Sequence, residues 1–297
     1  MATPAGPSGG FAFRPLRKPE EFRHAEDLQR EALGSDDAIA VPAAVLRSLQ
    51  DSGGLVLGAF ADIYLAGVAV SSIGWDGSSL YHLSLATVVR PEYRSHRVGF
   101  RLKAFQRDEV MRLGLSEIRW SFDPLQRAAA SLGVRRLGAR PDRYLTNHFG
   151  HLESAGRPVD ESDRLGVRWA LTSEAVEHRL AGELPTAEDD RRHQAEAFAI
   201  VRTEPGESGL RVPVEVAEPT GPTATLEIPF DLLSIRNHEP RSVRRWRHAV
   251  RDGFRAAFDL GYAVDDFASV TLEHERRCFY LLRLDRVREP PGPPPPG

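Results

Sequence analysis

The stretch that most constrains the fold of this 297-residue chain is residues 81–122. Residues 81–89 are rich in β-branched and apolar side chains and contain neither Gly nor Pro, so they predict a strand that ends before Pro91. Apolar residues then return at helical spacing over 98–113, and 116–122 alternates like a second strand. The predicted unit is therefore strand, basic turn, helix and strand.

The turn that enters the helix carries several arginines around one glycine. The first turn of a helix presents unpaired N–H groups, and the helix dipole adds partial positive charge there. Arg94, Arg97 and Arg101 add full charges, and Gly99 lets a ligand approach the backbone closely. These features predict an anion site suited to a diphosphate, with an ordinary solvated turn as the alternative.

The run Val88-Val89-Arg90-Pro91-Glu92-Tyr93-Arg94, together with Gly99, resembles motif A of the GNAT superfamily of acyl-CoA-dependent N-acyltransferases. In that family an Arg or Gln opens a Gly-rich loop whose amides hold the coenzyme A pyrophosphate. Arg94 opens the loop here, and Arg97 stands where the first Gly belongs, either crowding or reshaping the loop or pairing with a phosphate. The resemblance implies acetyl-CoA or another acyl-CoA as co-substrate, bound by Val88, Val89, Arg94, Ser95, His96, Arg97, Val98, Gly99 and Phe100.

The order of the elements before this unit supports the same resemblance. A strand is expected at 11–16, helices at 19–33 and 41–49, and a hairpin of strands at 55–60 and 63–73. The predicted fold class is α+β (mixed α/β), a GNAT-like central mixed sheet flanked by helices.

The segment after residue 122 departs from the family pattern. Asp123 is a suitable N-cap and Pro124 suits a first helical position, so a helix is expected to reach residue 137. Many family members carry a Tyr in this helix that protonates the leaving thiolate, and Val134 stands at that position here. An acid must therefore come from elsewhere. Closing strands are expected at 143–150 and 164–171.

Composition excludes several classes of protein. A net charge of −3 argues against a general nucleic-acid binder, and no apolar run approaches the roughly 20 residues that span a bilayer. The N-terminus lacks a signal peptide, and Cys278 is the only cysteine, so we expect a cytoplasmic protein without a disulfide. Lys18 and Lys103 are the only lysines among 39 basic residues, which resembles the codon bias of a GC-rich genome.

The chain divides into five expected parts: a disordered segment at 1–10, a GNAT-like domain at 11–172, a charged helical linker at 173–193, a C-terminal α+β domain at 194–288, and a Pro-rich tail at 289–297. The strongest helix is expected at 240–260, with strands before and after it. Two blocks carry a wider likeness: Trp120-Ser121-Phe122-Asp123-Pro124-Leu125-Gln126 in the first domain, and Glu227-Ile228-Pro229, Trp246-Arg247, Arg251, Phe254 and Gly261-Tyr262 in the second. Through them the chain resembles, over about residues 11–285, a little-characterised group of bacterial GNAT-superfamily proteins with an appended C-terminal domain.

Acyl transfer to an amine needs a base for the ammonium and an acid for the thiolate. The catalytic candidates are His82, Asp123 and Tyr144, and each has a structural alternative: a satisfied core histidine, a helix cap and a packed ring. Glu92 is more simply a surface ion pair with Arg94.

Arg247 and Arg251 are one helical turn apart beside Trp246, so they are candidates for gripping a substrate carboxylate or phosphate. The alternative is a solvated helix face. No zinc spacing, P-loop or Ser-His-Asp order is visible, so no metal is expected.

Two functions remain open. The first is an N-acyltransferase that passes an acetyl group directly from acetyl-CoA to the amine of a small molecule or amino-acid derivative, because Cys278 is a poor covalent carrier. The second is a catalytically degenerate GNAT-fold protein that binds coenzyme A or another ligand in a regulatory role. Neither nucleic acid nor membrane is an expected partner, and the oligomeric state is open between monomer and homodimer.

Overall fold

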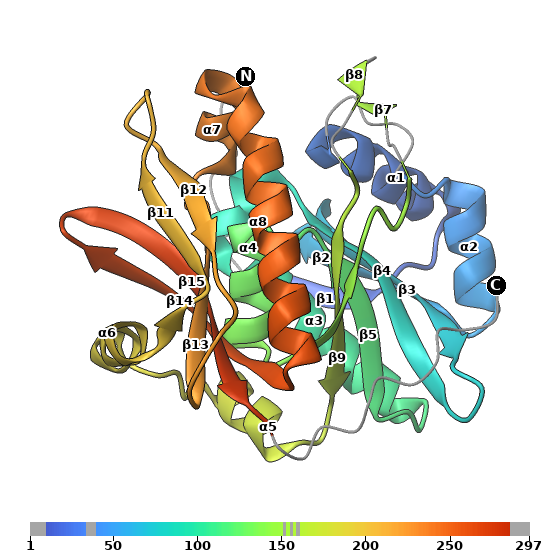
Figure 1. Cartoon of the computed structure of the whole chain (residues 1–297). Coiled ribbons are helices and arrows are strands. Elements are labelled where there is room, and N and C mark those ends of the chain that lie inside the picture. The colour runs from blue at the N-terminus through green and yellow to red at the C-terminus, as the bar shows by residue number, and fades with distance from the viewer. Residues whose placement is uncertain (1–9, 34–39, 151–152, 155–156, 159–160, 286–297) are drawn as a thin grey trace.

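The computed structural model describes residues 10–33, 40–150, 153–154, 157–158 and 161–285 (Figure 1). Two predicted segments lie outside these residues. They are the disordered N-terminal segment, apart from Gly10, and the Pro-rich tail.

A seven-stranded mixed sheet forms the first part of the molecule. Its order is β1-β2-β3-β4-β5-β9-β6, and β4 and β5 are its only parallel neighbours. The strands are β1 (Phe11–Pro15), β2 (Leu55–Ala61), β3 (Tyr64–Trp75), β4 (Leu80–Val89), β5 (Glu117–Phe122), β9 (Arg164–Ala170) and β6 (Arg140–Leu145). The predicted mixed α/β fold with a GNAT-like order of elements is confirmed.

Helices cover both faces of this sheet. On one face α1 (Pro19–Leu33) and α2 (Ala43–Asp51) bury Phe22, Leu28 and Leu46 against the strands. On the opposite face α3 (Val98–Arg112) buries Val98 and Leu102. The apolar spacing of these helices therefore predicts correctly that each presents one face to a core.

The segment after β5 forms α4 (Arg127–Ala130), which continues into the π-helical turn η3 (Ser131–Arg136). The predicted helix is present, but its N-cap is Gln126 and not Asp123. The Asp123 carboxylate instead accepts a hydrogen bond from the Leu125 amide at 3.0 Å, within the turn that precedes the helix. A short hairpin of β7 (Glu153–Ser154) and β8 (Arg157–Pro158) joins β6 to β9.

The predicted charged linker is helical and forms α5 (Glu174–Ala181) and α6 (Ala187–Glu196). Beyond it lies a four-stranded sheet of order β10-β13-β15-β14, and a two-stranded sheet of β11 and β12. The elements are β10 (Phe198–Ala199), β11 (Val201–Pro205), β12 (Arg211–Val216), β13 (Thr223–Ile228), α7 (Leu232–His238), α8 (Pro240–Asp259), β14 (Tyr262–Leu272) and β15 (Glu275–Leu284).

Two details of this second part differ from the sequence-based expectation. The strand expected at 197–202 is divided at Ile200, whose N–H bonds to Thr225 and whose C=O accepts from Ala217, so the chain passes from one sheet to the other there. The sequence predicts a loop where strand β12 forms, because Pro213 interrupts a short apolar run, and it gives no prediction for helix α7.

Both parts of the molecule share one hydrophobic core. Ile118 and Trp169 of the first sheet belong to the same buried cluster as Trp246 and Phe254 of α8. Helix α8 lies along the junction between the two sheets (Figure 1). The division into two domains remains a prediction. None of the described helices has the length and apolarity needed to span a bilayer.

Candidate functional site

A cavity opens where β4 and β5 separate. The two parallel strands pair only at His82 with Ile118 and at Leu83 with Arg119. Beyond these pairs the strands diverge, and the space between them is a cavity of about 640 Å³. This volume is typical of a pocket for a small organic ligand.

A β-bulge at Leu85 shapes the β4 side of the cavity. Ser84 pairs with Ser71 of β3 and Ala86 pairs with Val70, so Leu85 is the extra residue. Because β5 has turned away, the β4 edge that faces the gap carries peptide groups without a strand partner from this point on. Such an edge can hydrogen-bond an extended ligand that contains amides.

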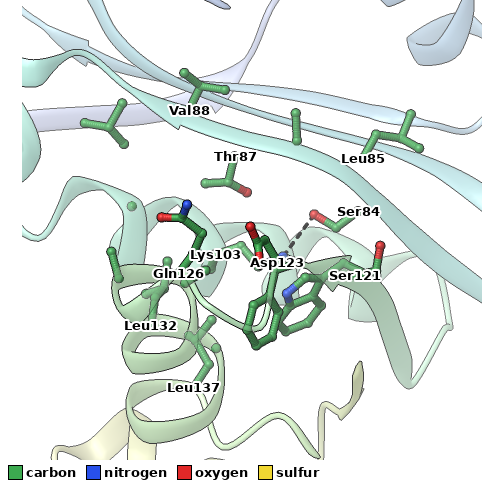
Figure 2. A pocket seen from close by; sticks show the side chains of 18 of the residues that line it. Ser84, Leu85, Thr87, Val88, Lys103, Ser121, Asp123, Gln126, Leu132 and Leu137 are labelled. Carbon is green, nitrogen blue, oxygen red and sulfur yellow. Dashed lines mark hydrogen bonds between the residues drawn. The ribbon is translucent and has the colours of Figure 1, made fainter. Parts of the chain in front are cut away.

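Both faces of the first sheet and the start of α4 contribute to the cavity wall (Figure 2). Ala32 and Val41 come from the α1–α2 side, whereas Gly99 and Lys103 come from α3. The other lining residues are Ser84, Leu85, Ala86, Thr87, Val88, Val89, Arg94, Trp120, Ser121, Phe122, Asp123, Gln126, Ala128, Ala129, Leu132, Gly133, Leu137 and Arg164. The cavity therefore passes through the sheet.

The N-terminus of α3 faces this cavity at Gly99. The hydrogen bond from the Arg101 amide to the Arg97 carbonyl belongs to the first helical turn, and the side chain of the N-cap residue Arg97 does not cap the helix. Arg97 itself has φ 57°, the left-handed conformation that favours glycine. The loop thus keeps a glycine-like backbone with an arginine in that position.

The predicted cofactor-binding residues divide into two groups. Val88, Val89, Arg94 and Gly99 line the cavity, and the Nε of Arg94 donates to the Val89 carbonyl at 3.2 Å. Of the others, His96, Arg97, Val98 and Phe100 are not lining residues, and the side chain of Ser95 is not among those the structure describes. The guanidinium of Arg97 lies 4.9 Å from the centre of the Phe100 ring, so it does not fill the entrance. Val98 is fully buried under the sheet.

Among the predicted catalytic residues, Asp123 lines the cavity. It follows β5 directly, and both its oxygens accept hydrogen bonds from Arg247 of α8, one of them at 3.0 Å. Arg247 is 4% exposed and belongs to the junction between the sheets. The predicted substrate-binding arginine is therefore engaged by a carboxylate of the chain itself.

Tyr144 and Arg251 belong to a neighbouring polar cluster. The Tyr144 hydroxyl donates to Asp163 at 2.7 Å, and Arg251 forms two hydrogen bonds of 2.9 Å with the same carboxylate and another with Glu161. Burial and Asp163 raise the pKa of Tyr144 above its ordinary value. Neither Tyr144 nor Arg251 lines the cavity.

His82 is completely buried in β4, where its Nδ1 lies 3.0 Å from the Ser71 hydroxyl. Burial lowers its pKa below the ordinary value. Since His82 does not line the cavity, any contact with a ligand there would need an intermediary.

Two basic residues of the cavity were not predicted from the sequence. Lys103 is 3% exposed, and its Nζ donates to the Ser84 hydroxyl at 3.0 Å (Figure 2) and to Gln106 at 2.7 Å. Its spacing from Gly99, one helical turn, and the rarity of lysine in this chain are signals that could have identified it.

Arg164, at the start of β9, is the second. Its Nε is buried without a hydrogen-bond partner, and its guanidinium has no ion-pair partner among the described residues. It lies 5.1 Å from the centre of the Phe149 ring, near Asp123 and Arg247. Asp123 attracts Arg164 but is hydrogen-bonded to Arg247, so two arginines share this carboxylate and Arg164 brings positive charge to the cavity.

Within the part of the chain that the structure describes, no group of three or more His, Cys, Asp and Glu side chains is arranged to hold a metal ion. Cys278 is buried in β15, and burial raises the pKa of its thiol. It is not a lining residue of the cavity.

No protein-family model and no curated protein matches the chain significantly. Solved structures do match it. The ribosomal-protein-S18-alanine N-acetyltransferase from Escherichia coli matches with a TM-score of 0.44 and 16% identity, over 55% of this chain and 95% of its own. Aminoglycoside 6'-acetyltransferase type Ii gives a TM-score of 0.45 and 16% identity, over 55% and 99%.

A putative acetyltransferase from Salmonella typhimurium, solved with its cofactor acetyl-CoA, gives a TM-score of 0.43 and 17% identity, over 56% of this chain and 96% of its own. Another match is a putative acetyltransferase of the GNAT family from Desulfovibrio desulfuricans. Over about 55% of its length, the chain is thus similar in fold to GNAT-family acetyltransferases, the family whose motif its sequence resembles.

Proposed function

We propose that this chain is an acyl-CoA-dependent N-acyltransferase that transfers an acetyl group directly to the amine of a small molecule. The observation that carries the proposal is the cavity between β4 and β5, which meets the uncapped start of α3 at Gly99 and Arg94. Amides and an arginine at that entrance suit the diphosphate of coenzyme A. The unpaired β4 edge beyond the bulge suits the two amides of the pantetheine arm.

Because the cavity passes through the sheet, a thioester threaded from the α3 side would meet an acceptor on the side of α1 and α2. The acceptor nitrogen then attacks the thioester carbonyl carbon, the C–N bond forms and the C–S bond breaks. No cysteine lines the cavity, so direct transfer in a ternary complex is favoured over a covalent acyl-enzyme.

The charges of the cavity favour an acceptor that carries both an ammonium and a carboxylate group. Asp123 supplies negative charge for the ammonium, although Arg247 holds both of its oxygens, which makes it an orienting group rather than a strong base. Arg164, which has no ion-pair partner of its own, supplies positive charge for the carboxylate. An amino-acid derivative meets both requirements.

The test has two steps. Acetyl-CoA is first titrated while thermal stability is followed, since a ligand that binds only the folded state raises the melting temperature. Thiol release from acetyl-CoA is then measured with the common amino acids and with matched amines that lack the carboxylate. We expect stabilisation by acetyl-CoA and a preference for acceptors that carry a carboxylate, which Arg164→Gln abolishes.

No stabilisation at high acetyl-CoA concentration would refute the proposal. Stabilisation without thiol release from any amine would favour the alternative of a degenerate coenzyme-binding protein. Equal use of amines with and without a carboxylate would refute the role of Arg164 alone.

A further inference from the structure

Lys103 is a buried lysine that forms no ion pair with any residue that the structure describes. Its side chain is 3% exposed, yet its Nζ contacts a hydroxyl and an amide oxygen instead of a carboxylate. The Nζ also lies 4.3 Å from the centre of the Trp120 ring. Buried lysines are rare unless they are paired with a negative charge, because removing an ammonium from water is costly. A purely structural role does not explain this arrangement.

The hydrogen bonds of Lys103 leave one direction of its Nζ unused. A tetrahedral nitrogen has four positions, of which one is the bond to Cε. The Ser84 hydroxyl at 3.0 Å and the Gln106 oxygen at 2.7 Å occupy two more. The fourth position holds a proton in the ammonium form and a lone pair in the amine form. Lys103 lines the cavity, and the Trp120 ring lies 4.3 Å from the same Nζ, so we assign this fourth position to proton exchange with the cavity.

We infer that Lys103 is the catalytic proton donor of the proposed acyl transfer, giving its proton to the thiolate of coenzyme A as the C–S bond breaks. This inference rests on the proposed function and names a residue for the step that Val134 cannot perform.

The step balances as follows. The neutral acceptor amine attacks the carbonyl carbon, and the electron pair of the C–S bond moves to sulfur. The Nζ of Lys103 gives sulfur a proton, which produces the free thiol and the neutral lysine amine. The new amide nitrogen loses one proton, and Lys103 regains one, so no net proton is consumed. No oxidant, reductant or further reactant is required.

The surroundings of Lys103 suit this exchange at neutral pH. Burial lowers its pKa to about 7, so both protonation states are accessible near neutrality. Burial, and after it charge repulsion from Lys103, lower the pKa of His82 on β4. The other charged groups of the cavity are Arg94, Asp123 and Arg164.

Other proton donors are less well placed. Tyr144 and His82 do not line the cavity, and the Tyr144 hydroxyl is committed to Asp163. Among the basic residues that do line it, arginine holds its proton too tightly to act as an acid at neutral pH. Lys103 is thus the titratable donor of the cavity with an accessible proton.

The experiment compares Lys103→Met and Lys103→Arg with the wild-type chain. Lys18→Met is the matched control, because it removes the exposed lysine. Three quantities are measured: the Kd of acetyl-CoA, the pH profile of thiol release with the best amino-acid acceptor, and basal hydrolysis with water as acceptor. Amine acylation by acetic anhydride at pH 7, read by mass spectrometry, measures whether each lysine is both neutral and reachable, with and without coenzyme A.

We expect Lys103→Met to lower kcat by about 10²–10⁴-fold, the usual contribution of a positioned acid, with the Kd of acetyl-CoA changed only a few-fold. Lys103→Arg keeps the charge but not the transferable proton, so it should be equally slow. The wild-type kcat should fall above a pKa near 7, and this decline should be absent from both variants. Lys18→Met should behave like the wild type.

Normal turnover in Lys103→Met, or an unchanged alkaline decline, would overturn the inference and leave the proposed function intact. Failure of the wild-type chain to bind acetyl-CoA would overturn both. Acylation of Lys103 at pH 7 that coenzyme A suppresses would support the inference. Acylation of Lys103 that coenzyme A leaves unchanged, or no acylation of Lys103 in the free protein, would contradict it.

Discussion

Arg247 of α8 and Asp123 at the end of β5 are 124 positions apart in sequence and form a bidentate ion pair beside the cavity. Their side chains are 5% and 17% exposed. The pair therefore links helix α8 to the wall of the candidate site, and it fixes the orientation of the Asp123 carboxylate.

Loss of one partner of this ion pair should lower the free energy of unfolding substantially. Arg247→Met leaves Asp123 without its counter-ion, and breaking a buried ion pair on one side costs about 3–5 kcal/mol. The double substitution Arg247→Met with Asp123→Asn should be milder, because neither charge is then left alone. Denaturant unfolding of the single and double variants measures the coupling. Arg202→Met is the control. The side chain of Arg202 is 57% exposed and forms a surface ion pair with Glu215, so its loss should change the free energy of unfolding little.

The substitution Gly99→Ala should weaken the binding of acetyl-CoA without lowering the stability of the protein. The nearest atoms to an added Cβ are Val89 Cγ2 at 3.7 Å and Leu132 Cδ2 at 3.8 Å, so the free protein accommodates it. Alanine also favours the helix by up to about 1 kcal/mol. We expect unchanged or slightly higher stability and at least about tenfold weaker binding of acetyl-CoA, because the methyl group occupies the closest approach of the ligand. Equal affinity in calorimetric titrations would show that Gly99 does not contact the ligand.

Arg94→Met tests the diphosphate contact with a pair of ligands. If Arg94 binds the diphosphate, the substitution should weaken the binding of coenzyme A by about tenfold or more, which is the usual effect of losing a charged hydrogen bond. The binding of pantetheine, which has no diphosphate, should not change. The dependence of coenzyme A binding on salt should also decrease. Arg97→Met is the matched control, because Arg97 lies over Phe100 and not in the cavity. A loss that is equal for both ligands would contradict the assignment.

Lys103 should make the stability of the protein depend on pH. Its pKa is lowered from 10.5 to about 7 in the folded state, so the unfolded chain binds the proton more tightly. The free energy of unfolding should therefore rise between about pH 7 and pH 10.5, the window between the two values.

In Lys103→Met that rise should be reduced, and the melting temperature at pH 7 should increase, since a buried group that resists ionisation is replaced by an apolar one. Thermal unfolding at several pH values checks this, with Lys18→Met as control. An identical pH dependence in wild type and Lys103→Met would mean that Lys103 is solvated in solution.

Much of the first sheet could be predicted because its signals are local. The strand ahead of Pro91, the helix that carries Leu102 and the strand ending at Phe122 all have clear periodicity, and the structure confirms each. The bulge at Leu85 and the separation of β4 from β5 could not be predicted, because they depend on pairing between strands rather than on spacing within one.

The candidate site was predicted in part for the same reason. Gly99 and Arg94 lie on the motif and line the cavity, whereas Lys103 and Arg164 acquire their character only from what surrounds them. A lysine on an amphipathic helix normally reaches water. Lys103 instead contacts Trp120 and Ser84, and these contacts depend on tertiary packing, which the spacing of residues within the helix does not reveal.

Because Trp169 and Trp246 belong to one buried cluster, we expect the first sheet to depend on the C-terminal elements for its stability. A fragment that stops after β9 would expose that surface and deprive Asp123 of Arg247, so we expect it to aggregate instead of binding a coenzyme. The elements from α5 onward support the cavity without lining it, so we expect a nick or frameshift within them to inactivate a site to which they contribute no side chain.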